Sequence, residues 1–225
     1  MNRLKCLLFV GWAVGLLFVT PVAAEGLRLN ISQGTGWVLL NLKDLNKPLR
    51  SAGYPTLPEG AQLYGVSTLF PQQDVPWRLG IGGLYWSLRA GETVSLDAAF
   101  LGGALDWTVR HVDTVRLSVG TTLGLDLVKL TLRKGRVFDF DDVLNPHRGQ
   151  RSDIRRWGVW TAPYLKYELS VLESDFLIKV WGGYVWTPWL SGWNQDGMFF
   201  DPTSFAGPPN DLSGPYVMVE WSLGI

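Results

Sequence analysis

Few residues in this chain could carry out acid–base or nucleophilic chemistry. It contains only two histidines, His111 and His147, and histidine is the side chain that most readily exchanges a proton near neutral pH. His147 follows Asn145 in a segment rich in charge, and Ser152 and Asp153 come soon after it. Serine, histidine and an acidic residue can act as nucleophile, base and orienting group. Three such residues meet often by chance in a charged loop, so we expect no catalytic residues and no enzyme.

Cofactor, metal and nucleic-acid sites are not indicated either. The sequence has no zinc-ligand spacing, no glycine loop before a helix that would hold a phosphate, and no calcium-binding EF-hand loop. We therefore expect no cofactor and no metal. The 20 basic residues are balanced by 20 acidic ones, whereas a nucleic-acid-binding protein would carry a basic stripe or patch.

A second kind of chemistry could come from charged residues that alternate with apolar ones. Lys166 and Glu168 lie between Leu165, Tyr167 and Leu169, so both charges fall on one face of an extended strand. The candidate binding residues of this type are Arg28, Arg78, Arg116, Asp126, Lys166, Glu168, Lys179 and Glu220. Buried charges must be paired, so we expect a structural polar core, with a site for a polar small ligand or an ion as the alternative.

The elements that position these residues are amphipathic strands. From Val115 to Leu127 every second residue is Val, Leu or Thr, and the residues between them are polar or glycine. Such a strand has one apolar and one polar face. The same pattern predicts eight strands, at 26–38, 61–70, 76–89, 92–109, 113–131, 154–170, 174–188 and 214–225. In the strand at 92–109 small residues occupy both faces, so its facing is unresolved.

The connections between these strands differ in length in a regular way. Those at 71–75, 110–112 and 172–173 are short, whereas those after the first, fifth and seventh strands are long. Alternating short and long connections lie at opposite ends of an even-stranded barrel. We therefore predict an all-β fold, an eight-stranded antiparallel up-and-down barrel.

The first long connection contains a predicted helix at residues 41–53. Leu42, Leu45, Leu49 and Ala52 would share one face, with Asn41 as N-cap and Gly53 at the end. Pro48 lies inside and would weaken or kink the helix. We expect the apolar face to close the barrel mouth as a lid, with burial against the lumen wall inside the barrel as the alternative.

The first 24 residues are expected to be a signal peptide that is removed, and residues 25–225 to form a single barrel domain. Arg3 and Lys5 precede an apolar run that ends before Val22-Ala23-Ala24, a typical cleavage site. Cleavage also removes the single cysteine, Cys6, so disulfides do not stabilise the mature chain. No other apolar run approaches the length of a transmembrane helix.

The strand pattern resembles that of small bacterial outer-membrane β-barrel proteins of the eight-stranded type. Its most specific part is the final strand, Val217-x-Val219-x-Trp221-x-Leu223-x-Ile225. The resemblance implies export to the outer membrane of a diderm bacterium and recognition of this strand by the outer-membrane assembly machinery. Some enzymes of this architecture modify lipids at the outer rim, which makes a lipid-modifying enzyme at His147 an alternative.

The amino-acid composition is typical of a membrane protein. The chain has 12 Trp and only 18% charged residues, and Trp collects at membrane interfaces. We expect Trp157, Trp160, Trp181, Trp186, Trp189 and Trp193 to form an interfacial girdle, with Trp160 and Trp181 in the lumen as an alternative. The predicted function is a non-enzymatic, monomeric outer-membrane barrel in contact with lipid, with a structural or surface-interaction role. The second alternative is a lipocalin-like periplasmic carrier of an apolar ligand, which would reverse the facing of every strand.

Overall fold

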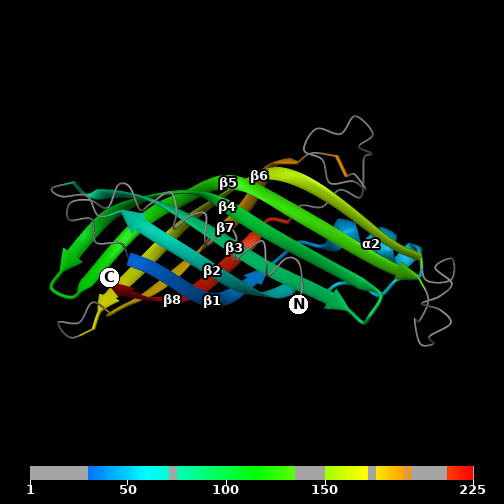
Figure 1. Cartoon of the computed structure of the whole chain (residues 1–225), viewed down its shortest axis with the longest axis horizontal. Coiled ribbons are helices and arrows are strands. Elements are labelled where there is room, and N and C mark those ends of the chain that lie inside the picture. The colour runs from blue at the N-terminus through cyan, green and yellow to red at the C-terminus, as the bar shows by residue number, and fades with distance from the viewer. Residues whose placement is uncertain are drawn as a thin grey trace.

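Alternating apolar and polar residues form the wall of a closed barrel. A computed structural model describes residues 30–70, 75–134, 150–171, 176–190, 192–193 and 212–224. The elements, shown in Figure 1, are β1 (Asn30–Leu39), α2 (Lys43–Ser51), β2 (Gly60–Phe70), β3 (Trp77–Ala90), β4 (Val94–Val112), β5 (Val115–Lys134), β6 (Gln150–Ser170), β7 (Phe176–Leu190) and β8 (Gly214–Gly224).

Each strand pairs antiparallel with its neighbour in the chain, and β1 closes the barrel against β8. The closing ladder runs from Asn30 opposite Gly224 to Val38 opposite Tyr216. The predicted eight-stranded up-and-down barrel is therefore confirmed. The boundaries differ from the predicted ones by a few residues, most at β6, which begins at Gln150 instead of 154. The expected signal peptide lies outside the described residues.

The two ends of the barrel differ as predicted. At one end, here called the short-turn end, brief connections join β2 to β3, β4 to β5 and β6 to β7. The other, here called the helix end, has the long connections and α2, with the brief β3–β4 turn as its exception (Figure 1). Strands β4, β5 and β6 have 19, 20 and 21 residues, against 10 for β1 and 11 for β8.

An apolar belt surrounds the barrel on the outside. No Asp, Glu, Lys or Arg interrupts it on the described strands, and Leu101 is its most exposed member, at 71%. The belt consists of Trp37, Tyr64, Val66, Leu79, Ile81, Leu101, Leu105, Trp107, Val119, Leu123, Leu125, Leu165, Tyr167, Val180, Tyr184, Trp186, Val217, Val219 and Trp221. The predicted facing, apolar outward and charged inward, is confirmed.

The interior has an apolar half and a polar half. Buried Leu, Val and aromatic side chains fill the helix end, where Leu88, Leu96 and Leu130 belong to one cluster. Most of the buried charged side chains lie at the short-turn end, among them Lys166 and Glu168, whereas Asp126 and Arg156 are buried farther toward the helix end. The lumen therefore changes from apolar to polar along the barrel axis.

A row of glycines lets β4 and β5 approach each other closely beside the buried Trp160. Gly82, Gly102 and Gly124 are paired in register across β3, β4 and β5, and Trp160 on β6 pairs with Gly124. The Trp160 ring contacts Phe100 edge-on, with centroids 5.2 Å apart. A Cβ at Gly124 would overlap the backbone of Leu101 and Gly102, so only glycine fits without movement of the wall.

We expect Gly124→Ala to lower the free energy of unfolding by about 1–3 kcal/mol, because β4 and β5 must move apart. Gly103→Ala is the matched control, since a Cβ there has its nearest neighbour, Gly80 O, at 3.8 Å. Urea unfolding of the two refolded variants, followed by tryptophan fluorescence, compares them. Equal losses of stability would contradict the role given to the glycine row.

Helix α2 lies within the range predicted for it, and its apolar residues Leu42, Leu45 and Leu49 are buried in the same cluster as the lumen side chains. Two details of the prediction were wrong. Ala52 is exposed, and Asn41 does not cap the helix, because Leu42 occupies the N-cap position without a side-chain cap. Gly53 does end it, with φ of 81°. Within the described residues no helix is long and apolar enough to cross a membrane.

Candidate functional site

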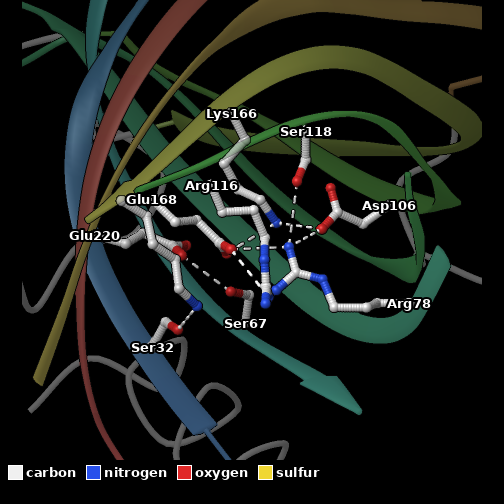
Figure 2. A network of polar contacts seen from close by, with 10 residues as sticks. Ser32, Ser67, Arg78, Asp106, Arg116, Ser118, Lys166, Glu168 and Glu220 are labelled. Atoms are coloured by element: carbon white, nitrogen blue, oxygen red, sulfur yellow. Dashed lines mark hydrogen bonds and ion pairs between the residues drawn. The ribbon is translucent and has the colours of Figure 1, made fainter. Parts of the chain in front are cut away.

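The strongest concentration of polar side chains lies in the lumen at the short-turn end. We call it the lumen network. Each of its members takes part in a hydrogen bond or ion pair within the lumen (Figure 2). They are Ser32, Ser67, Arg78, Asp106, Arg116, Ser118, Lys166, Glu168, Lys179 and Glu220. They come from all eight strands, because each strand turns its polar face inward.

Glu168 is the centre of this network. Its Oε2 lies 2.9 Å from Arg78 Nη2 and 3.7 Å from Arg116 Nη1, and its Oε1 lies 3.4 Å from Lys166 Nζ. Only 5% of its side chain is exposed. The carboxylate is therefore held by three cations at once, out of reach of bulk water.

Asp106 on β4 is the second anion that joins these cations. Arg78 donates a hydrogen bond to its Oδ2, and Lys166 Nζ donates another at 2.8 Å. Arg78 Nη2 also reaches Ser118 Oγ, at 3.4 Å. Arg78 and Lys166 thus bridge two carboxylates on different strands and tie β3, β4 and β6 together through the lumen.

Lys179 and Glu220 form the other side of the network. Lys179 Nζ donates to Ser32 Oγ at 2.6 Å, and Ser67 Oγ donates to Glu220 Oε2 at 3.0 Å. In register Lys179 lies opposite Glu168 on β6 and opposite Glu220 on β8. The basic side chain is therefore placed between two acidic ones on neighbouring strands.

The predicted polar cluster is largely brought together, with two exceptions. Arg28 lies outside the described residues. Asp126 is buried in the lumen but apart from the network, where its Oδ2 lies 3.9 Å from Arg156 Nη2. The Arg156 guanidinium in turn lies 5.7 Å from the centre of the Trp193 ring. Asp126 and Arg156 form a separate buried pair.

Sequence reasoning missed Asp106 and Arg156. A signal for Asp106 was present, because Leu105 and Trp107 on either side of it face outward in the apolar belt, so the residue between them faces inward. The signal for Arg156 was the same, because Trp157 beside it lies on the outer face of β6, so Arg156 faces inward and Arg155 outward.

A small cavity separates the lumen network from the aromatic core. It has a volume of about 20 Å³ and is lined by Lys166, Lys179, Glu220, Trp160, Trp181 and Met218, among others. This is room for about one water molecule, far below the roughly 300–1,000 Å³ of a site for a small organic molecule. In the part of the chain that is described, the lumen is filled by its own side chains.

The described residues give little support to the alternative of a lipid-modifying enzyme at His147. His147 lies outside them, as does the side chain of Ser152. Asp153, the proposed orienting acid, lies 3.0 Å from Lys129 Nζ in an ion pair. His111 is exposed near the short-turn end, away from the connection that contains His147.

The tryptophans divide between the wall and the lumen. Trp186 is exposed in the belt and Trp157 is half-buried on the outer face, as an interfacial girdle requires. Trp160 and Trp181 are buried in the lumen, which was the alternative to their place in the girdle. The girdle prediction was wrong for Trp193, which is buried beside Arg156. The side chain of Trp189 lies outside the described residues.

Comparison with known proteins identifies the fold. No protein-family model matches the chain, and no curated protein matches its sequence. Among solved structures it is similar to Neisserial surface protein A, with a TM-score of 0.55 at 7% identity over 89% of this chain and 100% of that one. Two structures of Ail, the attachment invasion locus protein of Yersinia pestis, align over the same shares at 11% identity with TM-scores of 0.46 and 0.49. The likeness to Neisserial surface protein A shows the fold of this chain, a small eight-stranded β-barrel.

Proposed function

We propose that this protein spans the outer membrane of a diderm bacterium as a monomeric, non-enzymatic barrel and serves the cell envelope through a structural or surface-interaction role. The observation that carries the proposal is the apolar belt, which no Asp, Glu, Lys or Arg interrupts on the described strands, around a lumen that contains the charges. Exposed apolar surface of this extent is costly in water and favourable in lipid. Closure of β1 on β8 leaves no unpaired edge along that ladder, as a strand in lipid requires.

The height of the belt supports the same proposal. On β5 the outward residues from Leu117 to Leu127 are uncharged, and about 9–11 tilted residues span a bilayer. Aromatic residues lie near both limits, with Trp107 and Trp221 toward the short-turn end and Trp37 and Trp186 toward the helix end. This is the arrangement of aromatic girdles in transmembrane barrels.

Gel mobility of the mature chain, with and without boiling, tests the membrane proposal. We expect a heat-sensitive shift and β-rich circular dichroism after refolding in detergent, and no soluble folded species in plain buffer. A folded monomer in plain buffer would instead support the lipocalin-like carrier. That carrier requires apolar side chains facing a ligand cavity, whereas the described lumen holds charges and a cavity of about 20 Å³.

The long connections at the helix end are the proposed surface of interaction. Replacing residues 138–147 by a Gly-Ser segment of equal length should leave the heat-sensitive shift unchanged, because the strand pairs of the wall and the contacts described in the lumen network are made between other residues. We expect the same variant to lose any cell-surface binding that the intact protein shows. A variant that no longer refolds would contradict the separation of wall and surface roles.

Export and assembly complete the proposal. Removal of residues 1–24 predicts a mature N-terminus at Glu25, which N-terminal sequencing of the membrane-extracted protein checks. The proposed contact with the assembly machinery is β8, whose outward residues Val217, Val219 and Trp221 alternate with buried Met218 and Glu220.

A further inference from the structure

Charge returns to the outer wall directly beyond the apolar belt, at the helix end. On one row of the wall Asp97, Lys129 and Arg155 are paired in register across β4, β5 and β6. The row before it, toward the short-turn end, consists of Ala99, Leu127 and Trp157. The transition from apolar to charged therefore occurs between two adjacent rows of outward-facing residues.

Four basic residues on this part of the wall form what we call the outer basic patch. They are Arg89, Lys129, Arg133 and Arg155. Arg89, Lys129 and Arg155 alternate with buried residues and so face outward. Arg133 is exposed and follows Leu132, which packs against the lumen core, and Arg89 is exposed as well. The two acidic residues on the same face, Asp97 and Asp153, leave the patch with an excess of positive charge.

The acidic residues are already engaged. Asp153 lies 3.0 Å from Lys129 Nζ, and Asp97 accepts a hydrogen bond from Tyr85 Oη at 3.3 Å. Arg89, Arg133 and Arg155 form no ion pair with another described residue. Lys129 and Arg155 also lie directly opposite each other on paired strands, an arrangement that destabilises a sheet unless an anion lies between the charges.

We propose that the outer basic patch binds the phosphate of an anionic lipid in the leaflet around the helix end of the barrel. The inference rests on the proposed membrane location, since the patch faces lipid only if the belt does. The patch continues the belt outward, which places its guanidinium groups at the depth of lipid headgroups, with Trp157 just inside them. Arg binds phosphate through paired N–H groups, and basic residues at this depth attract anionic lipids.

Native mass spectrometry of the refolded chain in zwitterionic micelles tests the proposal. Phosphatidylglycerol and phosphatidylcholine of identical acyl chains are the probes, since they differ in net charge and not in apolar content. We expect the intact protein to prefer phosphatidylglycerol, with each basic residue contributing on the order of fivefold in affinity. Arg133→Gln/Arg155→Gln should lower the preference on the order of 25-fold, because each removes one such contribution and neither residue has another ion pair among the described residues.

The matched control is Lys47→Gln/Arg50→Gln, which removes two exposed positive charges from α2 and none from the wall. We expect the control to keep the preference for phosphatidylglycerol. Should the first variant fail to refold, Arg89→Gln/Arg155→Gln tests the same patch. Equal loss in patch and control variants, or no preference in the intact protein, overturns the proposal.

Two further measurements show which proposal is wrong if the lipid preference is not found. Inorganic pyrophosphate at millimolar concentration should not displace the lipid; if it does, the site accepts free anions and its assignment to a lipid is wrong. The heat-sensitive gel shift of the same samples reports the membrane barrel itself. A normal shift without lipid preference overturns the lipid site alone, whereas loss of the shift overturns the membrane location.

Discussion

Replacing Glu168 with glutamine should lower the free energy of unfolding by about 3–5 kcal/mol, because it leaves buried cations without their shared carboxylate. Arg78, Arg116 and Lys166 all lie within 4 Å of the Glu168 oxygens. The glutamine keeps the size of the side chain, so packing changes little and the loss reports charge. Urea unfolding in lipid vesicles, followed by tryptophan fluorescence, measures it.

Two companion variants make this result specific. Glu92→Gln removes the same charge from the exposed β3–β4 turn and should change stability by less than about 0.5 kcal/mol. Adding Lys166→Met to Glu168→Gln should restore part of the lost stability, since it removes one positive charge from a lumen that then has too few carboxylates, while Asp106 keeps its ion pair with Arg78. If Glu168→Gln is as stable as the intact protein, the lumen network is not a stabilising element.

Introducing arginine at Leu123 should cost about 2–4 kcal/mol in a bilayer, the penalty for a cation on the lipid face of a barrel at mid-depth. Leu123 faces outward on β5 at 60% exposure. It lies midway between Val119, which pairs with Trp107, and Leu127, which pairs with Trp157. Refolding yield and urea unfolding in vesicles of one defined phospholipid measure the effect.

Ser95→Arg is the control for Leu123→Arg. Ser95 faces the same side of the wall, beyond the belt at the helix end, where the expected cost of arginine is about 0–1 kcal/mol. If the protein were a soluble carrier, both positions would face water and both substitutions would be nearly neutral. A cost at Leu123 alone therefore supports the membrane orientation, and equal costs contradict it.

The sequence was sufficient to predict the barrel because its wall obeys one simple rule. Lipid and lumen demand opposite polarity, so successive residues of β5 alternate without interruption from Val115 to Leu127. The same rule placed Lys166, Glu168, Lys179 and Glu220 inside. It required no knowledge of side-chain packing, since the period of two is a property of the extended backbone.

The unpredicted details depend on packing between strands that are distant in the chain. Glu168 and Lys179 lie opposite each other on β6 and β7, yet the ion pairs of Glu168 go to Arg78, Arg116 and Lys166. The contact between Trp193 and Arg156 at the helix end of the lumen could not be predicted either. Alternation along a strand does not specify which side chains meet inside the barrel. Alternation gives the face of a residue and not its partner.

The pairing of Asn30 with Gly224 has a consequence for the order of the strands. These residues are neighbours at the short-turn end, so a short linker could join them and the chain could be reopened between Val112 and Val115. The circularly permuted protein would retain every strand pair and the lumen network, but its last strand would be β4. The barrel wall can therefore form with either order of the strands along the chain. If the permuted protein refolds in vesicles but is not assembled in a cell, the assembly step requires β8 as the last strand.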